Sequence, residues 1–109
     1  INGVSVVFKR LENQPFKPLK AMIEAGLTQI DQGLIFLCAI HEGKAMFVAG
    51  CTKGLLDKGV DCSLLVKEAA NIAGGSGGGR KDLAQAGGKD INKVDEAMDA
   101  VYKKIVEIL

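Results

Sequence analysis

The chain has 109 residues, with 14 Lys and Arg against 13 Asp and Glu, and its formal net charge is +1. With 48% hydrophobic and 25% charged residues it has the composition of one folded domain, which excludes extended disorder. A net charge near zero also excludes a nucleic-acid-binding surface that covers the whole molecule. Any such surface must be a local patch of positive charge.

The first half of the chain predicts a strand, a helix and a hairpin. Residues 4–9 are rich in β-branched residues and predict a strand. Prolines then open a helix that ends at Gly33. Its buried stripe, expected from the helical spacing, is Leu19, Met22, Ile23 and Ile30. Residues 34–40 are apolar on both faces, which predicts a central strand covered on both sides, or covered on one side by this chain and on the other by a partner chain. A turn at Glu42-Gly43 leads into the next strand, over residues 45–51.

The second half predicts two helices around a short strand. Asp61 is expected to cap a helix that runs to about Ala73 and stops at two glycines. Residues 83–86 predict a short strand, and Asp90 caps the last helix. The apolar seam of that helix has spacings of 3 and 4 residues: Ile91, Val94, Met98, Val101, Ile105 and Ile108. The expected fold class is α/β of the α+β type: a small mixed β-sheet with helices packed on it, in the order β-α-β-β-α-(β)-α.

Glycine accounts for 14 residues, and half of these lie between Gly74 and Gly88. One interpretation of this stretch is a helix cap and a loop that passes close to a helix or strand, because glycine has no Cβ. The other is an anion nest, in which successive backbone N–H groups of the loop bind phosphate oxygens. Arg80 and Lys81 follow directly, and Lys89 and Lys93 are expected to return to the same end of the sheet.

The glycine stretch also excludes two common phosphate sites. It lacks the Gly-Lys-Ser/Thr ending of a triphosphate loop and follows a helix, which is the wrong context for a dinucleotide fingerprint. The candidate nucleic-acid-binding residues are Gly77, Gly78, Gly79, Arg80, Lys81, Gly87, Gly88, Lys89 and Lys93. The candidate loop-shaping residues are Gly74, Gly75 and Gln85.

The cysteine pattern and the first residues of the chain indicate the cellular compartment of the protein and its origin in a longer chain. Cys38, Cys51 and Cys62 are odd in number and have no CxxC spacing, which predicts reduced cytoplasmic thiols without a disulfide or a zinc site. No apolar run approaches the ~18 residues of a membrane span, and no secretory signal is present. Because the chain begins with Ile1 and has no initiator Met, we expect residues 1–109 to be one domain cut from a longer protein.

The run LLVKEAANIAGGSGGGRKDLAQAGGKD resembles the C-terminal domain of alanyl-tRNA synthetases, a branch of the DHH-associated domains that also occur in phosphodiesterases. The matching positions are Lys67 to Ala70, Ile72, Gly74, Gly75, Gly77 to Gly79, Arg80, Asp82 and Ala84 to Gly88. Two positions depart from the family pattern, which often has Lys in place of Ser76 and Pro in place of Lys81. The phosphodiesterase branch typically has His in place of Arg80, so this arginine favours the synthetase branch.

The resemblance implies that residues 1–109 are a single C-terminal DHH-associated domain of a longer enzyme. It implies a non-catalytic domain that contacts the outer corner of alanine-specific tRNA and links the aminoacylation and editing modules of its parent. It implies no cofactor in this fragment, since ATP and the editing zinc belong to other domains of the parent. The implied partners are the tRNA, those other domains and, in some members, a second copy in a homodimer, and no membrane. Two alternatives stay open: the nucleotide-gripping domain of a DHH-type phosphodiesterase, and a dimerisation or nucleic-acid-binding module.

Overall fold

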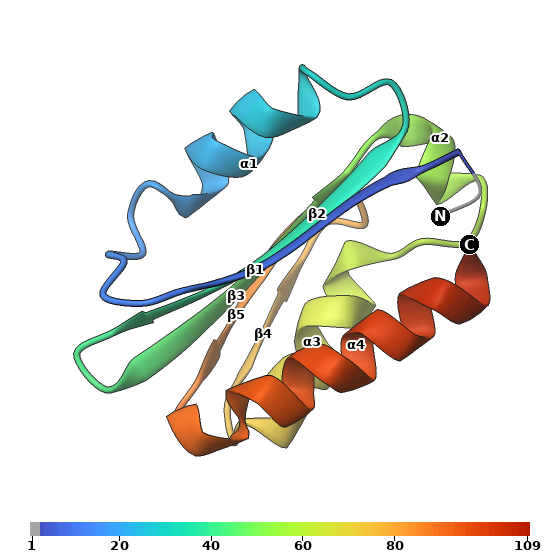
Figure 1. The fold of residues 1–109 in the computed structure, drawn as a ribbon. Coiled ribbons are helices and arrows are strands. Elements are labelled where there is room, and N and C mark those ends of the chain that lie inside the picture. Colours follow the sequence, from blue (N-terminus) through green and yellow to red (C-terminus); the bar gives the residue numbers. More distant parts are fainter. Residues whose placement is uncertain (1–2) are drawn as a thin grey trace.

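A five-stranded mixed sheet forms the centre of the molecule (Figure 1). The computed structural model describes residues 3–109, so the first two residues of the predicted 1–109 domain lie outside the described residues. The strand order is β1-β2-β3-β5-β4, with β1 parallel to β2 and the other neighbours antiparallel. The strands are β1 (Ser5–Leu11), β2 (Gly33–His41), β3 (Lys44–Cys51), β4 (Ser76–Gly79) and β5 (Leu83–Gly88).

Helices cover both faces of the sheet. Helix α1 (Leu19–Leu27) packs on one face, and α3 (Cys62–Ile72) and α4 (Val94–Ile108) pack on the other. A short helix α2 (Lys53–Leu56) leads from β3 toward α3, and a 3-10 turn η1 (Ile91–Lys93) precedes α4. The predicted fold class is therefore confirmed. None of the helices within residues 3–109 is long and apolar enough to cross a membrane.

The central position of β2 is also confirmed. Leu34, Phe36 and Cys38 face the core under α3 and α4, whereas Ile35 and Leu37 face the smaller core under α1. Every residue of β2 except the last is buried. The helices that cover the two faces of β2 all belong to this chain, so β2 needs no partner chain to remove its apolar faces from water.

The first helix and the hairpin differ in how well they were predicted. Leu19 and Ile23 are buried as expected, but Met22 is 41% exposed and α1 ends at Leu27, well before Gly33. Gly33 instead opens β2 and pairs with Ser5. The turn between β2 and β3 is confirmed, because Glu42 and Gly43 both have positive φ, at 52° and 78°.

The prediction of a loop across the glycines is wrong, because Ser76–Gly79 form the edge strand β4. A Cβ added at Gly77 would lie 2.4 Å from Cα of Ala86, and one at Gly79 would lie 2.9 Å from Cα of Ala84. At φ values of 158° and 156°, Gly77 and Gly79 pair with β5 in a backbone conformation that would direct a side chain into the partner strand. The interpretation of the glycines as a helix cap and a loop required the backbone to pass close to a helix or strand. That close approach is present, but it occurs within a strand and not in a loop.

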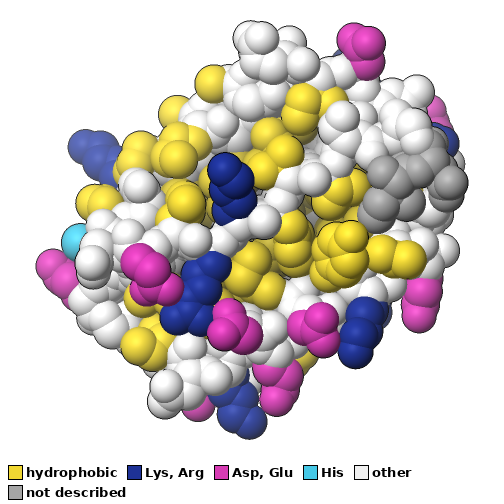
Figure 2. Space-filling view, viewed as in Figure 1, with side chains coloured by type: hydrophobic (Ala, Val, Ile, Leu, Met, Phe, Trp, Pro, Cys, Tyr) yellow, Lys and Arg dark blue, Asp and Glu magenta, His cyan; other side chains and the backbone are white. Residues whose placement is uncertain are grey.

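Hydrophobic side chains remain visible on the surface between α1 and α4, over the second edge strand, β1 (Figure 2). Phe8 of β1 lies 4.7 Å from the ring of Phe36 and 5.5 Å from that of Tyr102. Tyr102 and Val106 of α4 stay 41% and 47% exposed. The two edges of the sheet therefore differ, with an apolar one at β1 and a glycine one at β4.

Candidate nucleic-acid interface

Strands β4 and β5 form an antiparallel pair, called the ribbon below. Its register divides the predicted site residues into two groups. Gly79 pairs with Ala84 at one end of this ribbon, and Ser76 pairs with Gly87 at the other. The two ends are three residues apart, or about 10 Å at the rise of a strand. The expectation that Lys89 returns to the same end as Arg80 is therefore wrong. Lys93, in η1 just after Lys89, also follows the far end.

The turn from β4 to β5 carries Arg80 and Lys81. The Arg80 backbone N–H donates to the Leu83 carbonyl at 3.1 Å, and the Cys62 N–H donates to the Lys81 carbonyl at 2.8 Å. The turn is thus held by backbone bonds, while the Arg80 side chain stays 72% exposed. Its Nε lies 3.2 Å from Oδ1 of Asp82. The guanidinium at this end already has a carboxylate partner on the protein.

The surroundings of Arg80 are electrostatically mixed. Asp82 and Arg80 line a hollow of about 300 Å³ that also contains Glu24. Two carboxylates beside one guanidinium leave little excess positive charge for an anion. A phosphate that binds to the Nη groups of Arg80 must therefore do so beside a carboxylate.

At the other end, the N–H groups of Gly74 and Gly75 are already used. Gly75 N–H donates to the Ala70 carbonyl at 2.7 Å, and Gly74 N–H donates to Asn71 at 3.4 Å, which terminates α3. The N–H groups of Lys89 and Asp90 both donate to the Ala73 carbonyl at 2.9 Å. These four N–H groups are therefore not free to donate to a phosphate, and Gly74 and Gly75 shape the chain here, as the sequence predicted.

The outer edge of β4 offers donors in a different arrangement. The bond from Arg80 to Leu83 marks this pair as hydrogen-bonded, and such pairs alternate along an antiparallel ladder. Gly78 and Ser76 consequently bond β5, whereas the backbone groups of Gly77 and Gly79 point away from it. Because β4 is the last strand of the sheet, these two residues present backbone donors and acceptors at its free edge.

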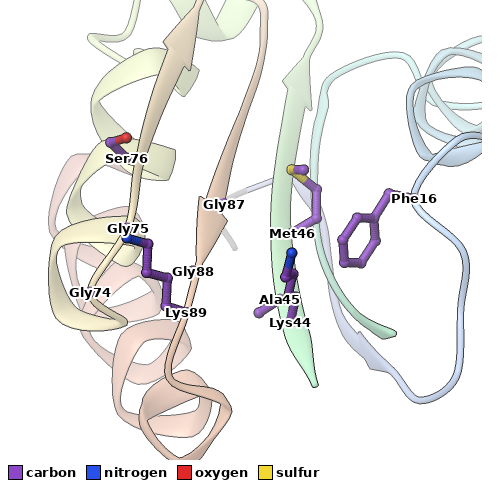
Figure 3. A pocket seen from close by; sticks show the side chains of 10 residues that line it. All are labelled: Phe16, Lys44, Ala45, Met46, Gly74, Gly75, Ser76, Gly87, Gly88 and Lys89. Atoms are coloured by element: carbon purple, nitrogen blue, oxygen red, sulfur yellow. The ribbon is translucent and has the colours of Figure 1, made fainter. Parts of the chain in front are cut away.

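A groove of about 410 Å³ lies where β3 begins and β5 ends (Figure 3). Its lining residues are Phe16, Lys44, Ala45, Met46, Gly74, Gly75, Ser76, Gly87, Gly88 and Lys89. This lining contains two cations and no carboxylate, in contrast to the hollow at Arg80. In Figure 3 the Lys89 side chain extends toward Gly75, and Lys44 lies across the groove on β3. Of the two hollows, the one without Arg80 therefore has the more positive lining.

Sequence reasoning missed Phe16, Lys44 and Met46. Lys44 and Met46 reach Gly87 and Gly88 only through the β3–β5 register, which pairs Ala45 with Gly88. No local motif in the sequence encodes that pairing. Phe36 and Phe47, which the sequence offered as core rather than as stacking platforms, are fully buried.

The remaining predicted residues lie along the ribbon. The backbone of Gln85 pairs with Gly78, and its side chain is exposed. A Cβ added at Gly78 would lie 2.9 Å from the Cε atom of Lys67, so this α3 lysine lies beside the middle of β4. Within residues 3–109 no group of three or more His, Cys, Asp or Glu side chains is arranged to hold a metal ion.

The three cysteines are buried free thiols. Burial raises the pKa of Cys38 to about 12. A hydrogen bond with Cys51, together with burial, raises the pKa of the Cys62 thiol. Cys38 and Cys62 consequently remain neutral thiols at physiological pH, and a neutral thiol is a weak nucleophile.

The architecture defines a small α/β domain with a five-stranded mixed sheet, a glycine edge strand and a groove lined by cations. The chain belongs to the family described as the DHHA1 domain, which matches residues 3–107. The family resemblance predicted from the glycine stretch is thereby confirmed.

Solved structures and curated relatives agree with this assignment. The C-Ala domain from Aquifex aeolicus alanyl-tRNA synthetase superposes with a TM-score of 0.79 at 30% identity, covering 95% of this chain and 89% of that one. The alanine–tRNA ligase of Alkaliphilus oremlandii is 45% identical over all 109 residues. That of Oceanobacillus iheyensis is 40% identical over 107 residues, or 98% of the chain. The chain spans only 12% of the length of each of these two relatives.

Proposed function

We propose that this chain is the tRNA-binding accessory domain of an alanine–tRNA ligase. The observation that carries the proposal is a match along essentially the whole chain to alanine–tRNA ligases and to a C-Ala domain. In this proposal the fragment itself is not catalytic. ATP and the editing zinc belong to other domains of the parent enzyme, which works in the cytoplasm.

The contact with tRNA is made through phosphates along β4. Gly77 and Gly79 present backbone N–H groups at the free edge, and their lack of side chains lets an RNA backbone approach the strand. Arg80 and Lys81 flank one end of this edge, and Lys89 and Lys93 flank the other. RNA folds are recognised largely through shape, phosphates and 2′-hydroxyls, which suits such an edge. The outer corner of tRNA is the proposed contact, and through it the domain links aminoacylation and editing.

A homodimer is a further part of the proposal. The apolar surface over β1 and α4, with Tyr102 and Val106 exposed, is the surface that supports it (Figure 2). A second copy placed there would remove apolar side chains from water without covering the glycine edge at β4, which lies across the sheet. RNA binding and self-association would then use opposite edges of one sheet.

Fluorescence anisotropy with folded alanine-specific tRNA tests the RNA contact. If three to five phosphates are neutralised, the slope of log K against log salt is expected to be about −2 to −4. Arg80→Ala should weaken binding and flatten that slope by about one. Lys103→Ala is the matched control, since Lys103 is an exposed cation on α4 that pairs with Asp99 away from the ribbon. Absence of tRNA binding at low salt, or equal losses in both variants, would contradict the proposal.

A further inference from the structure

The groove beside β4 has an apolar part that the proposed phosphate contacts do not use. Phe16 forms one wall, and Figure 3 shows its ring turned toward Met46. Gly87 and Gly88 of β5 line the opposite side and carry no side chains. The groove therefore combines an aromatic ring and a thioether with a bare backbone surface, at a volume of about 410 Å³ that is within the usual range of small-molecule sites.

The aromatic wall is held in place before any ligand arrives. The Phe16 carbonyl accepts a hydrogen bond from Leu19 N–H at 3.2 Å, and Gln14 N–H donates to the Ile40 carbonyl at 3.0 Å. The ring of His41 packs edge-on against Phe16, with centroids 6.2 Å apart and an interplanar angle of 71°. A wall fixed in this way loses little conformational entropy when a planar group stacks on it.

The charge of the groove specifies the rest of its ligand. Lys44 and Lys89 line it and no carboxylate does, so the ligand that fits is a flat apolar ring attached to an anionic group. A nucleotide has both parts. An acidic peptide fits less well, because an extended peptide is bound by pairing with a free strand edge. The free edge of β4 lies beyond β5 from the Phe16 wall, and β3 and β5 have neighbours on each side.

We propose that this groove binds an unpaired nucleobase of the RNA, stacked against Phe16 and Met46, with adjacent phosphates on Lys44 and Lys89. This inference rests on the proposed tRNA-binding function and adds a base contact to a site otherwise built from backbone and cations. Stacking tolerates any base, so the groove would recognise an unstacked nucleotide rather than a sequence.

Methyl NMR on the chain labelled with 13C at the methionine methyls tests the stacking directly. The chain has three methionines, and Met46 is the one in the groove, while Met22 on α1 and Met98 on α4 serve as internal controls. Titration with a single-stranded RNA tetranucleotide is expected to move the Met46 methyl upfield, through the ring current of the base, and to leave Met22 and Met98 in place. Inorganic phosphate should leave all three unmoved.

Two variants sharpen the test. Phe16→Ala is expected to weaken binding of the tetranucleotide by about 5- to 100-fold, the loss seen when one stacking aromatic is removed. Leu64→Ala is the control, because Leu64 is an apolar side chain 62% exposed near the start of α3 and does not line the groove, and it should change affinity less than twofold. The unchanged Met22 and Met98 signals report that each variant is folded.

The outcomes separate this inference from the proposed function. Failure of tRNA to bind at all overturns both. If tRNA binds with the expected salt slope but Met46 does not move and Phe16→Ala binds normally, only the nucleobase site is overturned. It is also overturned if a tetraglutamate peptide moves Met46 as far as RNA does, or if free adenosine monophosphate does so while RNA does not.

Discussion

β2 and β4 are strands of the same sheet, yet they are held in it by opposite means. In β2, Leu34, Phe36 and Cys38 are fully buried, and the strand lies between helices on both faces. β4 consists of one serine and three glycines and ends the sheet. Burial of apolar area stabilises the first strand, whereas close backbone pairing that a side chain would block stabilises the second. The contrast shows that a strand can be specified by missing side chains as well as by apolar ones.

The largest effect is expected at the centre of β2. Phe36→Ala removes a fully buried ring that lies between Phe8 and Phe47, with centroids 4.7 and 6.1 Å away. We expect the free energy of unfolding to fall by about 3–5 kcal/mol, measured by urea denaturation. Val106→Ala, at a position 47% exposed, should cost less than about 1 kcal/mol. Equal costs in the two variants would mean that β2 is not the core strand described above.

The next effect tests β4. Gly77→Ala places a Cβ 2.4 Å from the backbone of Ala86, which cannot rotate away, so we expect a loss of about 1–3 kcal/mol. Gly87→Ala is the control, because its Cβ would meet only the Ala45 carbonyl oxygen at 3.9 Å, and it should cost within about 0.5 kcal/mol. Hydrogen exchange should show faster exchange at Gly78 in Gly77→Ala while the amides of β2 stay protected. Equal protection of Gly78 in both variants would contradict the close-pairing explanation.

A pH dependence reports how completely β2 is removed from water. Burial raises the pKa of Cys38 to about 12 from an ordinary value of 9.0, so the folded state keeps a proton that the unfolded state releases between these values. Stability from this group is therefore complete below pH 9 and is lost as the pH rises toward 12. The slope is at most about 1.4 kcal/mol per pH unit. Urea denaturation of the unsubstituted chain and of Cys38→Ala at several pH values between 9 and 12 measures how the free energy of unfolding of each depends on pH. Identical slopes in the two chains would show that Cys38 is hydrated.

The smallest effect concerns the flank of β4. Asp82→Asn removes the carboxylate 3.2 Å from the Arg80 guanidinium and leaves the Asp82 backbone carbonyl free to keep its bond from Cys51 N–H. Because exposed ion pairs contribute under about 1 kcal/mol, we expect tRNA affinity to rise by roughly twofold to fivefold, measured by anisotropy at low salt. Asp99→Asn, at an ion pair on α4, should leave affinity unchanged. A weaker affinity in Asp82→Asn would indicate that the carboxylate orients Arg80 rather than competing for it.

Local signals in the sequence predicted the elements that local chemistry determines. Asp61 caps α3 as expected, accepting bonds from Ser63 N–H at 3.0 Å and Leu64 N–H at 3.3 Å. The seam of the last helix is confirmed at Val94, Val101 and Ile105, which are buried. It is wrong at its ends, because Ile91 lies in the preceding 3-10 turn and Ile108 is 37% exposed. These features depend on residues within a few positions of one another, which is the range that periodicity and capping describe.

The parts that sequence did not predict depend on long-range pairing. Glycines disfavour a strand by propensity, and only the neighbouring β5 backbone makes β4 a strand. Phe16 lies far from Lys89 in sequence, and the two meet in one groove because β2, β3 and β5 are laid side by side. The separation of Arg80 from Lys89 follows equally from register. A motif shows which residues belong to a site, but the sheet decides which of them lie together.

The glycines of β4 also limit how this surface can change. Any substitution at Gly77 or Gly79 that adds a Cβ meets β5, so these two positions offer no side chain through which the surface can be altered. Variation is left to the positions at its two ends, and the two departures from the family pattern, Ser76 and Lys81, occur there. Protein engineering that aims to change RNA affinity without loss of stability should therefore work on these flanking residues and keep the strand between them unchanged.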